Sequence, residues 1–143
     1  MHNRERALDV GLLQSGKFRE ALEGLLQWLA DTEDLVAHQK PPSADYKVVK
    51  AQVQEQRFLQ KLLLDRQGSV SSLFDMGREI AKNCAPAERA EIEGQLRELT
   101  ERFDALTGQA AERMQQLEDA MKVSRWRCLS SKIKQIIEMS HGY

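Results

Sequence analysis

The residue types that most often carry catalysis or metal binding are few in this chain of 143 residues, and they are widely spaced. The three histidines are His2, His38 and His141, and no Glu-x-x-His pair of the kind used in metal-binding bundles occurs. Cys84 and Cys128 match neither a zinc-ligand spacing nor a disulfide framework, so reduced thiols are expected. We expect no metal ion and no cofactor.

Motifs for phosphate binding and hydrolysis are missing as well. The 8 glycines are scattered singly, without a phosphate-binding loop or a Gly-x-Ser-x-Gly turn. Acidic clusters at 31–34 and 88–93 are most simply solvated helix faces, and the second suits the N-terminal turns of a helix. We therefore predict no catalytic residue and no enzymatic activity.

Charge and hydropathy limit the classes of partner. The formal net charge of −1 provides no field that would attract nucleic acid, so no nucleic-acid partner is expected. No apolar run approaches the roughly 18 residues of a membrane span, and the charged N-terminus leads into no signal peptide. From composition we expect a cytoplasmic protein without a membrane partner.

The segment with the most suggestive chemistry is the C-terminal tail, residues 124–143. It combines apolar residues at helical spacing with basic residues, and its candidate interaction residues are Arg125, Trp126, Arg127, Lys132 and Lys134. One interpretation is a basic amphipathic helix for an acidic partner, a calmodulin-like groove or an anionic membrane surface. The alternative is a helical extension that packs on a neighbouring molecule, or a non-native end.

The elements that position these residues are predicted to be three helices. Apolar residues make up 41% of the chain and aromatic residues only 6%, a balance that favours helix over strand. The 3 prolines, Pro41, Pro42 and Pro86, divide the chain into three long pieces, because proline interrupts a helix. We predict helices over about 16–37, 44–82 and 86–123.

Apolar residues in these pieces recur in alternating steps of three and four, which predicts coiled-coil packing. In the third piece the seam, the row of core-facing positions, is Ile92, Leu96, Leu99, Phe103, Leu106, Ala110, Arg113, Leu117 and Ala120. Short connections favour antiparallel neighbours. The predicted fold is an elongated, left-handed, antiparallel three-helix bundle. Its predicted core-packing residues are Phe18, Trp28, Leu63, Phe103, Leu106 and Leu117.

The register between the helices follows if both connections are tight turns, because residues equidistant from such a turn lie side by side. Trp28 is then expected near Val53 and Gln56, at the level of residues 113–117. Phe18 is expected near Leu63, at the level of residues 103–106. The polar seam residues Gln52, Gln56 and Arg66 are interpreted as a register-setting layer rather than a site.

Together these residues resemble a known family. The pattern Phe18-x2-Ala21-x6-Trp28-Leu29, both connections and the third-helix seam resemble the spectrin repeat, and residues 37–60 resemble the rod repeats of the spectraplakins. The resemblance implies a structural spacer and protein-interaction repeat of a cytoskeletal protein that joins actin filaments to microtubules through its other domains. The implied partners are adjacent repeats and the cytoskeleton.

The resemblance also suggests how the chain is divided. Residues 1–15 are predicted to be a helical junction into the first helix, residues 16–123 the repeat, and residues 124–143 a basic amphipathic extension. The alternative function is an autonomous helical adaptor whose basic C-terminal helix binds an acidic partner or a membrane surface.

Overall fold

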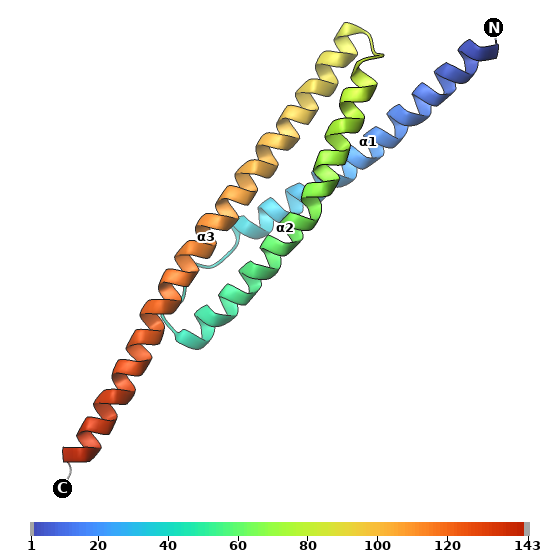
Figure 1. Cartoon of the computed structure of the whole chain (residues 1–143). Helices are drawn as coiled ribbons and strands as arrows, with labels where there is room; N and C mark the ends of the chain where they lie inside the picture. Colours follow the sequence, from blue (N-terminus) through green and yellow to red (C-terminus); the bar gives the residue numbers. More distant parts are fainter. Residues whose placement is uncertain (1, 142–143) are drawn as a thin grey trace. The chain divides into compact units, whose positions relative to one another are not determined.

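A computed structural model describes the backbone of residues 2–141 and the side chains of residues 15–141. The regular elements in these ranges are three helices, α1 (His2–Ala37), α2 (Tyr46–Ala81) and α3 (Pro86–His141), which Figure 1 shows in chain order from blue to red. The prediction of an all-helical, three-helix fold is confirmed. The predicted junction at residues 1–15 lies within α1 from residue 2 onward, but most of its side chains lie outside the described residues.

The helix ends follow from local chemistry. The Asp45 carboxylate accepts a hydrogen bond of 3.0 Å from the Lys47 amide, so Asp45 caps the first turn of α2. At the other end of α2, the Arg89 guanidinium donates to the carbonyls of Ala81, at 2.9 Å, and Lys82, at 3.3 Å. α3 begins at Pro86, where a missing backbone donor has no consequence.

The chain forms two compact units, and the first comprises Met1–His38 and Leu63–Thr107. In it, α1 packs with the second half of α2 and the beginning of α3. Its buried apolar side chains include Phe18, Leu22, Leu25, Leu29, Leu63, Val70, Leu73, Leu96, Leu99, Phe103 and Leu106. All three helices meet at Gly77, where a Cβ atom would lie 2.8 Å from Leu96 Cδ1 and 2.9 Å from Phe18 Cε2.

The predicted register of α1 is wrong. Trp28 packs on Phe103, with ring centroids 6.4 Å apart, which is about three helical turns before the expected level of residues 113–117. Phe18 likewise meets Gly77 and Leu96 rather than the level of residues 103–106. The error arose because the connection between α1 and α2 was assumed to be a tight turn.

The second unit comprises Gln39–Leu62 and Gly108–Tyr143. It therefore contains two helical segments and residues 39–45 of the α1–α2 connector, which spans residues 38–45. Its apolar cluster consists of Val49, Val53, Met114 and Leu117, flanked by Ala120 and Met121. Gln56 is almost fully buried beside the cluster, and its amide donates to the Ala110 carbonyl at 2.8 Å. This bond ties α2 to α3.

The connector does not turn back at once but runs along the start of α2. The Gln52 amide donates to the Pro41 carbonyl at 3.2 Å, and its oxygen accepts from the Ser43 amide at 2.9 Å. Gln39 donates to Gln56 at 3.2 Å, one turn further along α2. The connector therefore occupies the surface of α2 that a tight turn would have left for α1, which explains the shifted register.

The seam of α3 also differs from its prediction at one position. Arg113 is half-buried, and Met114 occupies the buried position between Ala110 and Leu117. A straight helix has 3.6 residues per turn rather than 3.5, so a strict heptad pattern drifts around it. A step of four from Ala110 places the apolar Met114 against Val49 and Val53.

Candidate functional site

The predicted core-packing residues lie in both units. Phe18, Leu63, Phe103 and Leu106 are buried in the first unit and Leu117 in the second, whereas Trp28 is only half-buried. One face of the Trp28 ring lies under the Arg66 guanidinium, whose Cζ is 5.1 Å from the ring centroid. Arg66, predicted to be a seam residue, is thus an exposed side chain that covers Trp28.

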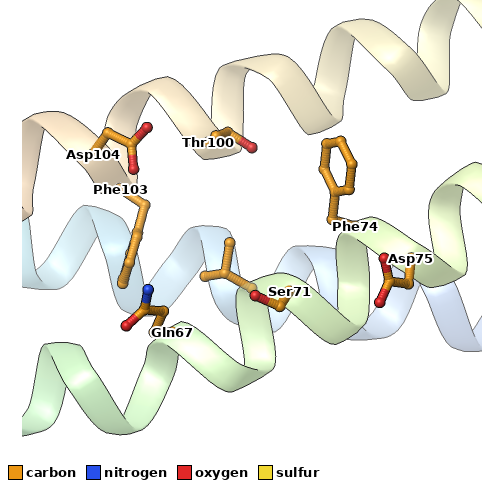
Figure 2. Close-up of a pocket in the computed structure, with 8 residues that line it drawn as sticks. Gln67, Ser71, Phe74, Asp75, Thr100, Phe103 and Asp104 are labelled. Carbon is orange, nitrogen blue, oxygen red and sulfur yellow. The ribbon is translucent and has the colours of Figure 1, made fainter.

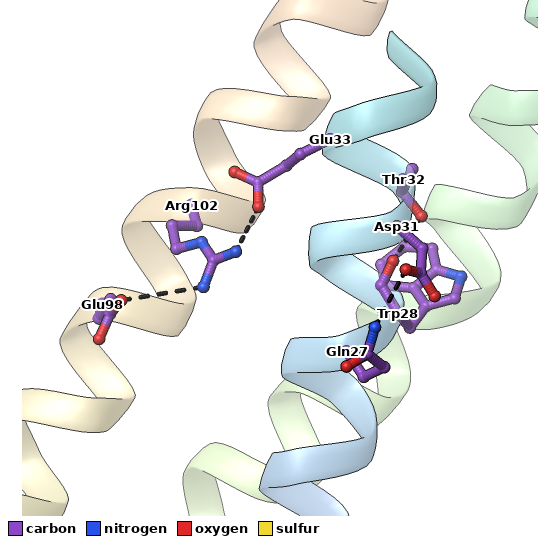
Figure 3. Close-up of polar contacts among 7 residues, drawn as sticks. All are labelled: Gln27, Trp28, Asp31, Thr32, Glu33, Glu98 and Arg102. Atoms are coloured by element: carbon purple, nitrogen blue, oxygen red, sulfur yellow. Dashed lines mark hydrogen bonds and ion pairs between the residues drawn. The ribbon is translucent and has the colours of Figure 1, made fainter. Parts of the chain in front are cut away.

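A cross-helix ion pair lies on the α1–α3 face of the first unit. The Arg102 guanidinium donates a hydrogen bond to Glu33, and it lies 3.8 Å from Glu98 of its own helix (Figure 3). The hydrogen bond to Glu33 and the charges of both carboxylates raise the pKa of Arg102 above its usual value, against the opposing effect of partial burial. Because its pKa is raised, Arg102 stays charged at neutral pH, and on the alkaline side its contribution to stability is lost as the pH rises through that raised pKa.

A shallow groove of about 300 Å³ lies between α2 and α3 in the first unit (Figure 2). Its lining residues are Gln67, Val70, Ser71, Phe74, Asp75, Thr100, Phe103 and Asp104. Asp75 stands on α2 and Asp104 on α3, and the two phenyl rings lie between the helices. The groove contains hydroxyl groups but no histidine, lysine or cysteine beside them, so it offers no activated nucleophile.

The remaining candidates for chemistry are dispersed. The His38 ring lies 2.8 Å from the Asp34 carbonyl of α1, His141 is exposed on α3, and the side chain of His2 lies outside the described residues. Cys84 is half-buried and Cys128 is exposed. In the part of the chain that the structure describes, no three His, Cys, Asp or Glu side chains are grouped so that they could hold a metal ion.

The C-terminal tail continues α3 without a break. Among the described residues Ser124 is the last buried one, and its hydroxyl donates to the Ala44 carbonyl of the connector at 3.0 Å. Every residue from 125 to 141 is exposed, including the five candidate interaction residues Arg125, Trp126, Arg127, Lys132 and Lys134. Within residues 2–141, no helix has both the length and the apolar content needed to cross a bilayer.

Several structural roles were missed at the sequence level. The close approach of the helices at Gly77 was not predicted, although an isolated glycine within a helix is a signal of such an approach. The Glu33–Arg102 pair joins segments far apart in the chain and has no local signal. The Arg89 cap had a signal, since basic residues often bond the last carbonyls of a preceding helix.

Comparison with known proteins identifies the family of the chain. The sequence profile described as "Spectrin repeat" matches residues 13–119. The chain belongs to the spectrin-repeat family. Spectrin repeats are structural and non-catalytic, which accords with the dispersed chemistry described above. The matched range ends before the C-terminal tail.

Comparison with individual proteins shows which members of this family the chain resembles. The chain is 52% identical over 118 residues, 82% of its length, to human "Microtubule-actin cross-linking factor 1, isoforms 6/7", of which it covers 3%. Identity and coverage of the chain are the same for the mouse protein of that name, of which it covers 4%. Rat "Utrophin" is 31% identical over 106 residues, which is 73% of the chain and 3% of utrophin. The resemblance to a spectraplakin rod repeat is confirmed, and the chain spans only a few per cent of the length of these relatives.

Proposed function

We propose that this repeat is a structural spacer and protein-interaction unit within a cytoskeletal cross-linking protein. The observation that carries the proposal is the 52% identity to a relative named as a microtubule–actin cross-linking factor. The packed helices of both units support a mechanical role.

The proposed partners are adjacent repeats of a longer chain, and the proposed location is the cytoskeleton of the cytoplasm. Contacts with actin filaments and microtubules are assigned to other domains of that chain. We further propose residues 16–123 as the repeat proper and residues 124–143 as an extension. The six core-packing residues named above are proposed to stabilise the repeat rather than to contact a ligand.

Co-sedimentation tests the spacer function directly. The full chain is incubated with actin filaments or with microtubules and centrifuged, beside a variant that ends at Ser124. Because filament binding is assigned to other domains, the variant should remain in the supernatant with either filament. Saturable pelleting of the variant with either filament would show that the repeat itself binds filaments, and the spacer function would then be wrong.

A second candidate function is favoured by one observation. Residues 125–141 are exposed on all sides of α3, with six large apolar side chains among them, and the family match ends at residue 119. Isolated exposed apolar residues are ordinary, but a continuous row of them on a helix marks an interaction surface. The tail is therefore proposed as an interaction helix that acts in addition to the spacer.

A further inference from the structure

The tail of α3 carries one apolar face. Successive residues of an α-helix are about 100° apart, so five large apolar side chains of the tail fall within an arc of about 100°. They are Trp126, Leu129, Ile133, Ile136 and Ile137. Each is exposed by about half or more, from 47% for Leu129 to 70% for Trp126. A face this wide exceeds the narrow seam that a single partner helix covers.

Basic residues flank this apolar arc on both sides. Arg125 and Lys132 lie at one edge of the arc, and Lys134 and Arg127 lie about 60° and 80° beyond the other edge. The first acidic residue of the tail is Glu138, which stands beside Arg127 on the polar face. Long basic side chains on both sides of the arc can extend their charged groups to lipid phosphates while their stems rest on apolar material.

The packed part of α3 leaves this face open. Leu117 and Ser124, which α3 buries in the second unit, project from the side of the helix opposite Trp126 and Ile133, and the buried Met114 projects from its flank. A flat surface that meets the apolar arc is therefore not blocked by the cluster around Val49 and Val53. Contact with a flat surface requires such an unobstructed side of the helix, whereas a single partner helix is narrower and would need less free space.

Charge also limits how far such a contact extends toward the N-terminus of α3. Glu112 and Asp119 project on the same side of α3 as the apolar arc, and both are exposed. An anionic surface would be repelled there, so the contact should begin at about Lys122. The tail, and not the packed part of α3, is the complementary segment.

We infer that residues 125–137 form a binding helix for the surface of an anionic lipid bilayer, lying in its plane at the red end of α3 in Figure 1. This inference rests on the second candidate function and names its partner. It revises the expectation of no membrane partner. That expectation came from the net charge of the whole chain, whereas the basic residues of the tail are concentrated beside its apolar arc.

Vesicle binding by the full chain tests the inference. The probes are vesicles of phosphatidylcholine alone and of phosphatidylcholine mixed with phosphatidylserine. Binding is expected only with phosphatidylserine and should fall at high salt. Trp126 should shift its fluorescence emission to the blue on binding, and the Trp126→Phe variant, which keeps Trp28 in the first unit, should bind without that shift.

Charge reversal supplies the matched comparison. Each basic residue near an anionic surface contributes about fivefold to affinity, so R125E/R127E should weaken binding by more than about 20-fold. The control R57E/K61E makes the same change of net charge at two exposed positions of α2 and should bind like the unaltered chain. Circular dichroism checks that both variants are folded.

Three results would overturn the inference: no binding to either vesicle, equal binding to both, or equal weakening by the two charge reversals. A soluble polyglutamate peptide separates this failure from failure of the second candidate function. If the chain captures the peptide through Arg125 and Arg127 but binds no vesicle, the tail is an interaction helix for acidic protein, and the lipid inference is wrong. If it captures neither, both are wrong, while the spacer function remains tested by filament co-sedimentation.

Discussion

At Gly77 the side chains of α1 and α3 come so close to α2 that no side chain fits between them. Phe18 and Leu96 are both 2% exposed, so neither has free space into which it could move. Interiors packed in this way respond to the addition of a single methyl group. The absence of a side chain at position 77 is thus part of how the first unit packs.

Gly77→Ala is expected to lower the free energy of unfolding by about 1 kcal/mol, because the strain of overpacking exceeds the gain in helix propensity. The matched control is Gly68→Ala on the same helix, where a Cβ would have nothing within 4 Å. That change should raise stability by up to about 1 kcal/mol. Urea unfolding of both variants measures the difference, and equal stability of the two would contradict the close packing at Gly77.

Gln56 is the most deeply buried polar side chain described, at 1% exposure. Gln56→Ala removes its hydrogen bond to Ala110 and leaves a void, so a loss of about 2–3 kcal/mol is expected in thermal or chemical unfolding. Gln56→Leu keeps most of the volume and should lose about half as much. If leucine were as damaging as alanine, hydrogen bonding rather than volume would dominate at this position.

Among the helices, the sequence located the two connections better than the outer ends or the register. The observed ends at Ala37, Tyr46, Ala81 and Pro86 lie close to the predicted ones, because proline and caps act locally. In contrast, α1 already begins at His2 rather than at about residue 16, and α3 continues to His141 rather than ending at about residue 123. The register of α1 depends on the path of the connector, which is fixed by Gln52 and Gln56 contacts that no local pattern specifies. The candidate interaction tail was recognisable from its composition, whereas the exposure of its apolar arc required the structure.

The connector should loosen when Gln52 is removed. Gln52→Ala deletes the acceptor for the Ser43 amide and the donor to the Pro41 carbonyl, so hydrogen exchange at Ser43 should become fast. Exchange within the apolar cluster around Val53 should change little by comparison. The matched control is Gln54→Ala, at an exposed position of α2 two residues after Gln52. Equally faster hydrogen exchange at Ser43 in both variants would contradict the assigned role of Gln52.

On the scale of the whole molecule, folding and the tail should be separable. A chain that ends after residue 127 retains Ser124 and its bond to Ala44, and it loses only exposed residues, so its midpoint of thermal unfolding should match that of the full chain. A chain that ends at Leu117 also loses Ala120, Met121 and Ser124, and it should be destabilised by about 2 kcal/mol or more. Destabilisation of the longer variant would show that the tail packs on the repeat.

The unbroken course of α3 has a further consequence, for helix nucleation. Starting a helix is unfavourable, whereas extending one adds a hydrogen bond for each residue fixed. Residues 125–141 extend a helix whose first turns are already held by packing, so they need only propagate it. The same residues as a free peptide are expected to be mostly coil in water by circular dichroism, since short isolated helices are marginal. The packed repeat is then the template that keeps its own tail helical before any partner arrives.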